Sequence, residues 1–251
     1  MDRVPSYALH TLATLASILE AVLGSDLVGL YLYGSLTQRA FDPARSDIDC
    51  LAVVRGHPTP PACARLRRRL MRAASSDRWI SRVQMQILLE QRLLRADRRG
   101  ARYQFGTLRP SGSDGNPLVW MNVLASGVTI TGPRPSTLLP PITRDMVDAA
   151  LRRELEYLRT EISDPASPWR RRQFYRAYAV LTLCRILYTS RARKVISKPR
   201  AAGWALRTLP IRWHPLIRAA IASDRGRKAS MALADIARLI AFADERLSAP
   251  A

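Results

Sequence analysis

The sequence predicts two parts of different class, an α/β domain followed by an all-α helical bundle. In the first half, short apolar runs typical of strands alternate with amphipathic helical patterns, whereas the second half contains helical patterns only. Between them, residues 133–143 read PRPSTLLPPIT and have the composition of a linker. We therefore expect an N-terminal domain at 1–135, with a mixed sheet and flanking helices, and a C-terminal domain at 143–251.

Apolar patterns in the N-terminal domain predict two long helices and four strands. Residues 7–24 carry apolar residues at helical spacing and end at Gly24, which indicates a helix. The basic stretch 65–76, RLRRRLMRAASS, indicates a second helix. Its expected inward-facing residues are Leu66, Leu70 and Met71. Strands are expected at 27–34, 48–54, 82–90 and 126–133. Residues 107–117 have the composition of a loop.

Beyond the linker the apolar residues recur at helical spacing in five stretches, which predicts a bundle of helices. The stretches are 143–162, 172–192, 199–208, 214–222 and 228–247.

The composition narrows the class of protein. No run of about eighteen apolar residues occurs, so no membrane span is expected, and the N-terminus lacks the features of a signal peptide. The three cysteines and three histidines are far apart, which argues against disulfides or a zinc site. A cytoplasmic monomer is the expectation. With 40 basic and 20 acidic residues the net charge is +20, which attracts polyanions such as nucleic acid or nucleotides.

Two carboxylates one residue apart, Asp47 and Asp49, begin the second predicted strand. Because side chains alternate along a strand, both point to the same face, where they repel each other unless a cation lies between them. Mg²⁺ with nucleotide phosphates suits such a pair, and two ions are expected. Gly34 and Ser35 end the preceding strand and are expected to begin a helix whose N-terminus binds phosphate. The alternative is an ordinary strand end with two solvated acids.

The stretch YGSLTQRAFDPARSDIDCLAVV (33–54) resembles the polymerase-β-like nucleotidyltransferases. More narrowly, the chain resembles the aminoglycoside O-adenylyltransferases that modify streptomycin and spectinomycin. The likeness continues through YQFGTL (103–108), the TGP after the last strand, and VLTLCRILYTSRARKVISKPRAAGWAL (180–206). Because these stretches keep their order and span nearly the whole chain, the resemblance implies a polymerase-β-like nucleotidyltransferase domain followed by a helical bundle.

The resemblance also implies a reaction, the transfer of a nucleoside monophosphate from Mg²⁺-NTP to a hydroxyl group, with ATP as the expected donor. By motif, Gly34 and Ser35 would hold the triphosphate. Asp47 and Asp49 would hold the metal ions. Lys198, in the ISKP stretch, matches a lysine that reaches the nucleotide phosphates across the cleft between the domains.

One catalytic position departs from the family. The family has a third carboxylate that binds metal and accepts the proton of the acceptor hydroxyl, and the matching position here is Gln84, an amide that cannot take a proton. Glu90 lies on the same face of the strand but roughly 20 Å away, at about 3.3 Å per residue. Asp114, in the loop SGSDGN, could swing in instead. Otherwise the base is missing, which costs about 10²- to 10⁴-fold in rate, or the alignment is off by two residues.

The acceptor region departs as well. The family binds its cationic drugs with acidic side chains near the stretch that here reads SPWRRRQFYRAYAVL (167–181). Trp169 is retained, but residues 165–223 hold 13 Arg and Lys and no Asp or Glu. Such a surface repels a polycation and favours an anionic acceptor. We expect phosphate to be bound by four arginines, Arg170, Arg171, Arg172 and Arg176. Interleaved aromatics could stack on bases, although their spacing also fits burial: Trp169, Phe174, Tyr175, Tyr178, Trp204 and Trp213.

Three functions stay open at this point. The main expectation is an Mg²⁺-dependent nucleotidyltransferase that moves an NMP, expected to be AMP, to an anionic hydroxyl acceptor such as RNA or a tRNA end. The first alternative is a streptomycin or spectinomycin adenylyltransferase. The second, favoured by Gln84, is a catalytically weak or inactive nucleotide- or RNA-binding homologue. The sequence does not identify the acceptor.

Overall fold

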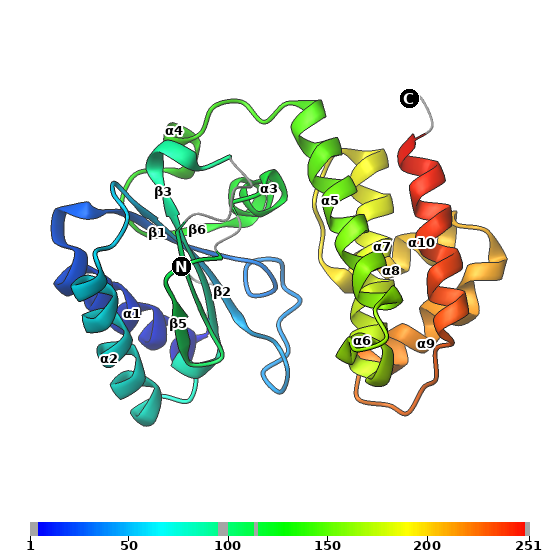
Figure 1. Cartoon of the computed structure of the whole chain (residues 1–251), viewed down its shortest axis with the longest axis horizontal. Coiled ribbons are helices and arrows are strands. Elements are labelled where there is room, and N and C mark those ends of the chain that lie inside the picture. Colours follow the sequence, from blue (N-terminus) through cyan, green and yellow to red (C-terminus); the bar gives the residue numbers. More distant parts are fainter. Residues whose placement is uncertain (1–4, 95–99, 113–114, 249–251) are drawn as a thin grey trace. The chain divides into compact units, whose positions relative to one another are not determined.

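The computed structural model of the chain describes residues 5–94, 100–112 and 115–248. The chain divides into two compact units, residues 1–141 and 142–251, and the division falls inside the Pro-rich segment 133–143. Figure 1 shows a unit built around a sheet, coloured blue to green, and a unit built only of helices, coloured green to red. The predicted fold class, α/β followed by all-α, is confirmed.

The N-terminal unit contains a six-stranded mixed sheet with the strand order β5-β4-β3-β2-β1-β6. The strands are β1 (Leu27–Tyr33), β2 (Ile48–Val54), β3 (Val83–Leu89), β4 (Ala101–Gln104), β5 (Thr107–Arg109) and β6 (Val128–Thr131). Strands β2 and β3 are parallel, and every other neighbouring pair is antiparallel. Two of these strands were not expected, since β4 and β5 are too short for alternation to reveal them. They form a hairpin whose turn places Phe105 and Gly106 at positive φ.

Four helices flank this sheet: α1 (Ser6–Leu23), α2 (Pro60–Ser76), α3 (Pro117–Ser126) and α4 (Pro135–Leu138). Short 3₁₀ turns occupy Gly24–Asp26, Ile80–Arg82 and Glu90–Arg92. Helix α2 begins five residues earlier than predicted because Thr59 caps it, accepting a hydrogen bond from the Ala62 backbone N–H. Helix α3 was missed altogether. Its cap is Asn116, whose side chain accepts from the first backbone N–H groups of the helix.

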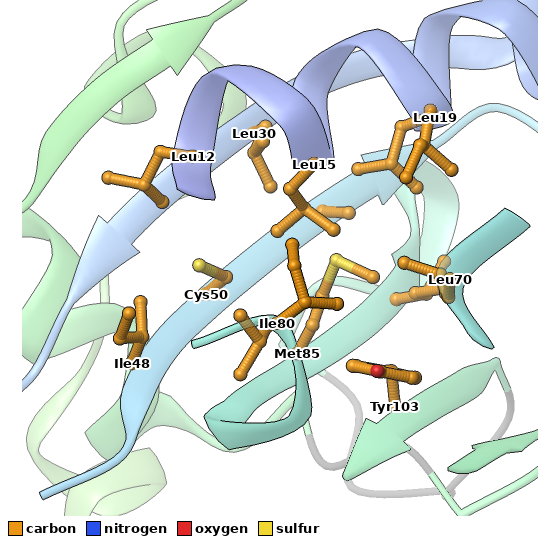
Figure 2. Packing of buried hydrophobic residues seen from close by; sticks show 14 of the residues in the cluster. Leu12, Leu15, Leu19, Leu30, Ile48, Cys50, Leu70, Ile80, Met85 and Tyr103 are labelled. Atoms are coloured by element: carbon orange, nitrogen blue, oxygen red, sulfur yellow. The ribbon is translucent and has the colours of Figure 1, made fainter. Parts of the chain in front are cut away.

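The main core lies between the sheet and the two helices α1 and α2. Figure 2 shows Leu12, Leu15 and Leu19 of α1 packed with Leu30, Cys50 and Met85 of the strands. From α2, Leu66 and Leu70 are fully buried, as predicted. Met71 was expected to face inward too, but 53% of it is exposed, because one residue further along a helix turns the side chain by about 100°. The opposite face of the sheet is covered by α3, where Trp120 packs beside Tyr31.

One helical stretch among the described residues, Ser6–Asp26, is long and apolar enough to cross a membrane by length and composition. Its apolar residues pack in the core of the N-terminal unit, where Leu12, Leu15 and Leu19 are buried. A core helix of a globular unit has the same composition, so this packing accounts for the stretch.

The C-terminal unit is a bundle around one central helix. Its helices are α5 (Arg144–Ser163), α6 (Pro168–Arg171), α7 (Gln173–Ala192), α8 (Lys198–Thr208), α9 (His214–Asp224) and α10 (Leu233–Ser248), with a 3₁₀ turn at Ile211–Trp213. The other five helices all pack against α7. All five predicted helices are present. The last one starts at Leu233 rather than at residue 228, and Met231 in the preceding segment is buried.

Candidate active site

The structure brings together three of the residues predicted to carry the chemistry. Asp49 lies in β2, where it pairs with Tyr33 of β1 on one side and with Gln84 of β3 on the other. Asp47 directly precedes β2, and alternation places it on the same face as Asp49. The Gln84 side chain donates a hydrogen bond from Nε2 to Asp47 Oδ2 at 2.5 Å. Two carboxylates and one amide therefore meet where the parallel strands β2 and β3 begin.

Gly34 lies against this cluster with almost no space to spare. A Cβ atom built on Gly34 would lie 2.1 Å from Asp49 Oδ2, and the residue has φ +80°, a conformation that favours glycine. The helix predicted to start at Gly34 and Ser35 is absent. Residues 34–39 form turns instead, with hydrogen bonds from Gln38 N to Gly34 O and from Ala40 N to Ser35 O. Gly34 itself, at positive φ, cannot belong to a right-handed helix, and Arg39 at φ +56° interrupts any helix that would continue beyond the turns.

This turn is braced by α3, the helix that the sequence did not reveal. The hydroxyls of Thr37 and Ser126 are 3.0 Å apart and hydrogen-bonded. The Gln38 amide donates to Asn122 Oδ1, and Asn122 donates in turn to a backbone carbonyl within α3. The polar face of α3 thus fixes the segment that follows Gly34.

The loop that carries Asp47 is held from another direction by Arg82. Its guanidinium donates to the carbonyl oxygens of Pro43 and Ser46, the former at 2.6 Å. Within the loop, Asp42 pairs with Arg45, whose guanidinium lowers the pKa of that carboxyl group. Sequence reasoning missed Arg82. The only signal was a basic residue directly before the third strand.

The oxygen donors of this cluster suit Mg²⁺. Carboxylate and amide oxygens are hard ligands, and Mg²⁺ in nucleotide sites is commonly held by one or two carboxylates plus phosphate oxygens. Within residues 5–94, 100–112 and 115–248, no three or more side chains of His, Cys, Asp and Glu gather. Asp47 and Asp49 remain the candidate ligands, and Gln84 contacts Asp47 through its amide. Asp114, proposed as a substitute base, lies outside the described residues.

Ser35 and Lys198 were also predicted to contact the nucleotide, and both assignments stay predictions. Ser35 is partly buried in the turn after β1. Lys198 is the first residue of α8, and its ammonium nitrogen lies 3.9 Å from the centre of the Tyr178 ring, a cation–π contact. The aromatic face orients this lysine within the helical unit.

The predicted acceptor aromatics divide into core and surface. Trp169 is only 7% exposed, stacks on Tyr175 with ring centroids 5.4 Å apart, and meets Tyr157 and Tyr178 edge-on. It is therefore a core residue of the helical unit. Phe174, in contrast, is 61% exposed. Helical spacing correctly favoured burial for Trp169, but could not separate it from Phe174.

The four predicted phosphate-binding arginines do not form one free group. Arg176 donates to the carbonyl oxygens of Met231, at 2.8 Å, and Arg170. Arg170 itself donates to Ser163 O at 3.0 Å. Arg171 and Arg172 are exposed. Arg170 thus ties α6 to the end of α5, and Arg176 ties α7 to α6 and to the segment before α10. The sequence could not indicate these bonds because their acceptors are backbone carbonyls.

Acidic side chains reach this region from α5. Glu161 accepts a hydrogen bond from the Ser167 hydroxyl at 2.6 Å, beside the start of α6. Burial raises the pKa of Tyr157 to about 12, and the negative charges of Glu161 and Glu154 act in the same direction. The stretch 165–223 has no acids, but the surface around Trp169 does. The sequence window missed them because α5 precedes it, although Glu154, Tyr157 and Glu161 share one helical stripe.

Comparison with known proteins agrees with this architecture. A family model described as aminoglycoside adenylyltransferase, C-terminal domain, matches residues 137–248. Spectinomycin 9-adenylyltransferase of Campylobacter jejuni is 25% identical over 219 residues, which cover 80% of this chain and 79% of that protein. The chain is thus similar to the aminoglycoside adenylyltransferases over most of its length. The family resemblance predicted from the sequence is thereby confirmed.

The fold is supported independently by a solved structure. Spectinomycin adenyltransferase AAD(9) of Enterococcus faecialis, crystallised with ATP and spectinomycin, superposes with a TM-score of 0.74 at 20% identity. The match covers 96% of this chain and 99% of that one. The predicted nucleotidyltransferase domain followed by a helical bundle is confirmed. The prediction of a nucleotidyltransferase enzyme is confirmed by these two relatives, which are both adenylyltransferases.

Proposed function

We propose that this chain is an Mg²⁺-dependent adenylyltransferase that moves AMP from ATP to a hydroxyl group of a cationic aminocyclitol such as spectinomycin. The observation that carries the proposal is the meeting of Asp47, Asp49 and Gln84 beside Gly34, on the nucleotidyltransferase fold. The relatives named above supply the donor and the acceptor class, since both are spectinomycin adenylyltransferases. This acceptor replaces RNA, the main expectation from the sequence, which neither of the two relatives named above supports.

Asp47 and Asp49 are the proposed ligands of Mg²⁺, which when bound neutralises charge on phosphate oxygens. The Gly34 turn leaves room for a phosphate to approach the backbone, and Ser35 adds a hydroxyl donor there. Phosphoryl transfer depends mainly on such positioning and charge neutralisation. The role of Gln84 is to orient Asp47 through its hydrogen bond. It cannot accept the proton of the acceptor hydroxyl, so we expect slow turnover.

The acceptor class rests on charge as well as on relatives. A cationic acceptor needs carboxylates or aromatic faces, and the α5 stripe of Glu154, Tyr157 and Glu161 supplies both next to Trp169. Residues 165–223 alone are purely basic, but these carboxylates of α5 add negative charge to the same surface. Arg170 and Arg176 are occupied by backbone carbonyls, which weakens the case for a phosphate site in the same place.

The test is direct labelling. The protein is incubated with Mg²⁺ and α-labelled ATP, with spectinomycin, streptomycin or total tRNA in separate tubes, and products are separated and identified by mass. We expect AMP on an aminocyclitol hydroxyl and none on tRNA. The matched variants are Asp47→Asn, which should abolish labelling, and Asp42→Asn, which changes a carboxylate of the same loop that faces Arg45 and should keep it.

Three outcomes would contradict this proposal. Label on tRNA with none on either drug would restore the anionic acceptor that the sequence suggested. Label on no acceptor, with ATP still bound in calorimetry, would indicate a nucleotide-binding homologue without transferase activity. Equal labelling by Asp47→Asn and the unmodified chain would remove the carboxylate pair from the chemistry.

A further inference from the structure

Helix α2 carries a concentrated stripe of arginines that the proposed reaction does not use. Arg65, Arg68, Arg69 and Arg72 are spaced i, i+3, i+4 and i+7, so they share one face of the helix. All four are exposed, and Arg67 adds a fifth exposed charge beside them. At about 1.5 Å per residue the stripe is about 10 Å long. Four positive charges therefore lie along two turns of one surface helix.

Nothing in the described part of the chain neutralises this stripe. The ion pairs found among the described residues involve arginines outside the stripe: Arg45, Arg159, Arg193 and Arg238. Like charges at i,i+3 and i,i+4 repel and weaken the helix that carries them. The stripe is thus unfavourable for the stability of α2, and a bound polyanion would relieve the repulsion.

The helix is held as a fixed platform. On its inner face Ala62, Leu66 and Leu70 are buried against the core, and Thr59 caps its first turn. An amphipathic helix that inserts into a membrane needs a free apolar face. In α2 that face is already occupied by the core, which leaves only the charges for an external partner. Phosphates of a nucleic acid fit this surface, because each guanidinium group can donate two parallel hydrogen bonds to a phosphate. This binding needs no insertion of apolar side chains.

The stripe and the candidate active site lie on opposite faces of the sheet. Leu66 and Leu70 of α2 belong to the same buried cluster as Cys50 and Met85, so these two strand residues point to the face that α1 and α2 cover. Asp49 and Gln84, each one residue away along its strand, point to the other face. A partner on the stripe would therefore leave the carboxylate pair free.

We infer that this stripe, Arg65, Arg68, Arg69 and Arg72, is a docking surface for the phosphate backbone of duplex nucleic acid, without base recognition. The surface is separate from the site of adenylyl transfer, and the inference does not depend on the acceptor. Its role is to hold the protein on a polyanionic structure while the site on the opposite face works on a small molecule.

The experiment compares two variants of equal charge. In the stripe variant Arg65, Arg68, Arg69 and Arg72 are all changed to Gln. The control changes four exposed arginines of the helical unit to Gln: Arg153, Arg200, Arg218 and Arg227. Binding of the full chain to a fluorescent RNA duplex of about 20 base pairs is measured between about 50 and about 200 mM KCl. Far-UV circular dichroism and melting check that both variants fold.

We expect the stripe variant to bind at least about tenfold more weakly than the control at low salt. The slope of log affinity against log salt should fall by about 3 to 4 for the stripe variant, given about 0.9 per lost phosphate contact. If the fourfold variant does not fold, Arg68→Gln with Arg69→Gln should lower the slope by about 2. Equal affinities of the two fourfold variants would overturn the inference, since net charge alone would explain binding. Stripe-dependent binding to phosphatidylserine vesicles with none to RNA would overturn it in favour of a membrane.

Discussion

Replacing Gly34 by alanine tests whether the contact between the turn after β1 and Asp49 organises the site. The new Cβ would lie 2.1 Å from Asp49 Oδ2, about 1.3 Å short of the 3.4 Å at which ordinary contact begins. Alanine at φ +80° also carries the cost of a left-handed backbone, about 1–2 kcal/mol. The carboxylate must therefore move by about 1 Å, or the turn must open.

A matched glycine separates these two costs. Gly106, at the tip of the β4–β5 hairpin, has φ +71° and no atom within 4 Å of an added Cβ. Gly106→Ala should therefore lower the free energy of unfolding by about 1–2 kcal/mol and leave nucleotide binding intact. Gly34→Ala should lose a further ~1–3 kcal/mol through overpacking. Because misplacing a catalytic group by about 1 Å can cost about 10²-fold in rate, adenylyl transfer should fall by about that factor.

The assays are urea denaturation, calorimetry with ATP in the presence and absence of Mg²⁺, and initial rates of label transfer. The reasoning predicts a large difference between the two alanine variants in the second and third assays. It would be refuted if Gly34→Ala and Gly106→Ala bound Mg²⁺-ATP equally well and transferred AMP at equal rates. In that case the crowding of Asp49 against the turn would have no part in the site.

Three other perturbations follow from the same contacts. Gln84→Glu should place a third carboxylate in the cluster, so the melting temperature without Mg²⁺ should fall and transfer with Mg²⁺ should rise by up to about 10²- to 10⁴-fold; an unchanged rate would mean that this position holds no base. Arg82→Ala should lower the free energy of unfolding by about 1–3 kcal/mol and weaken Mg²⁺-ATP binding, because it removes the bond that holds the loop. Arg78→Ala, a change at an exposed neighbour, should have neither effect in denaturation or calorimetry. Trp169→Ala should lose about 3–5 kcal/mol of unfolding free energy as a core truncation, and Phe174→Ala less than about 0.5 kcal/mol; similar losses would contradict the assignment of Trp169 to the core.

The local pattern of the chain was enough to find the long elements. The apolar patterns placed α1, α7 and the strands β1, β2 and β3 close to their observed bounds, because these elements carry long runs or regular sets of apolar side chains that are buried. It failed for the β4–β5 hairpin and for α3. These elements are short, and their identity depends on neighbours: β4 is paired by β3, and α3 packs against β1.

The electrostatics of the helical unit show the same limit. Counting charges along 165–223 predicted a basic, acid-free surface. Folding places Glu161 of α5 beside Ser167 and ties Arg176 to Met231 O, so charges distant in sequence become neighbours. A charge count over one window describes a surface only if that window alone builds it, and in a bundle no helix does.

The sequence by itself determined the class of fold and the family that the chain resembles. It also placed Asp47 and Asp49 on one face of a strand, since alternation along a strand needs no knowledge of the partner strands. It also identified Gln84 as the departure from the family. Only the tertiary structure decided that Gln84 donates to Asp47, that Asp49 lies against Gly34 without room for a Cβ, and that Arg82 holds the loop before β2. Those are contacts between segments far apart in the chain, and their distances are set by strand register and core packing, which no local pattern encodes.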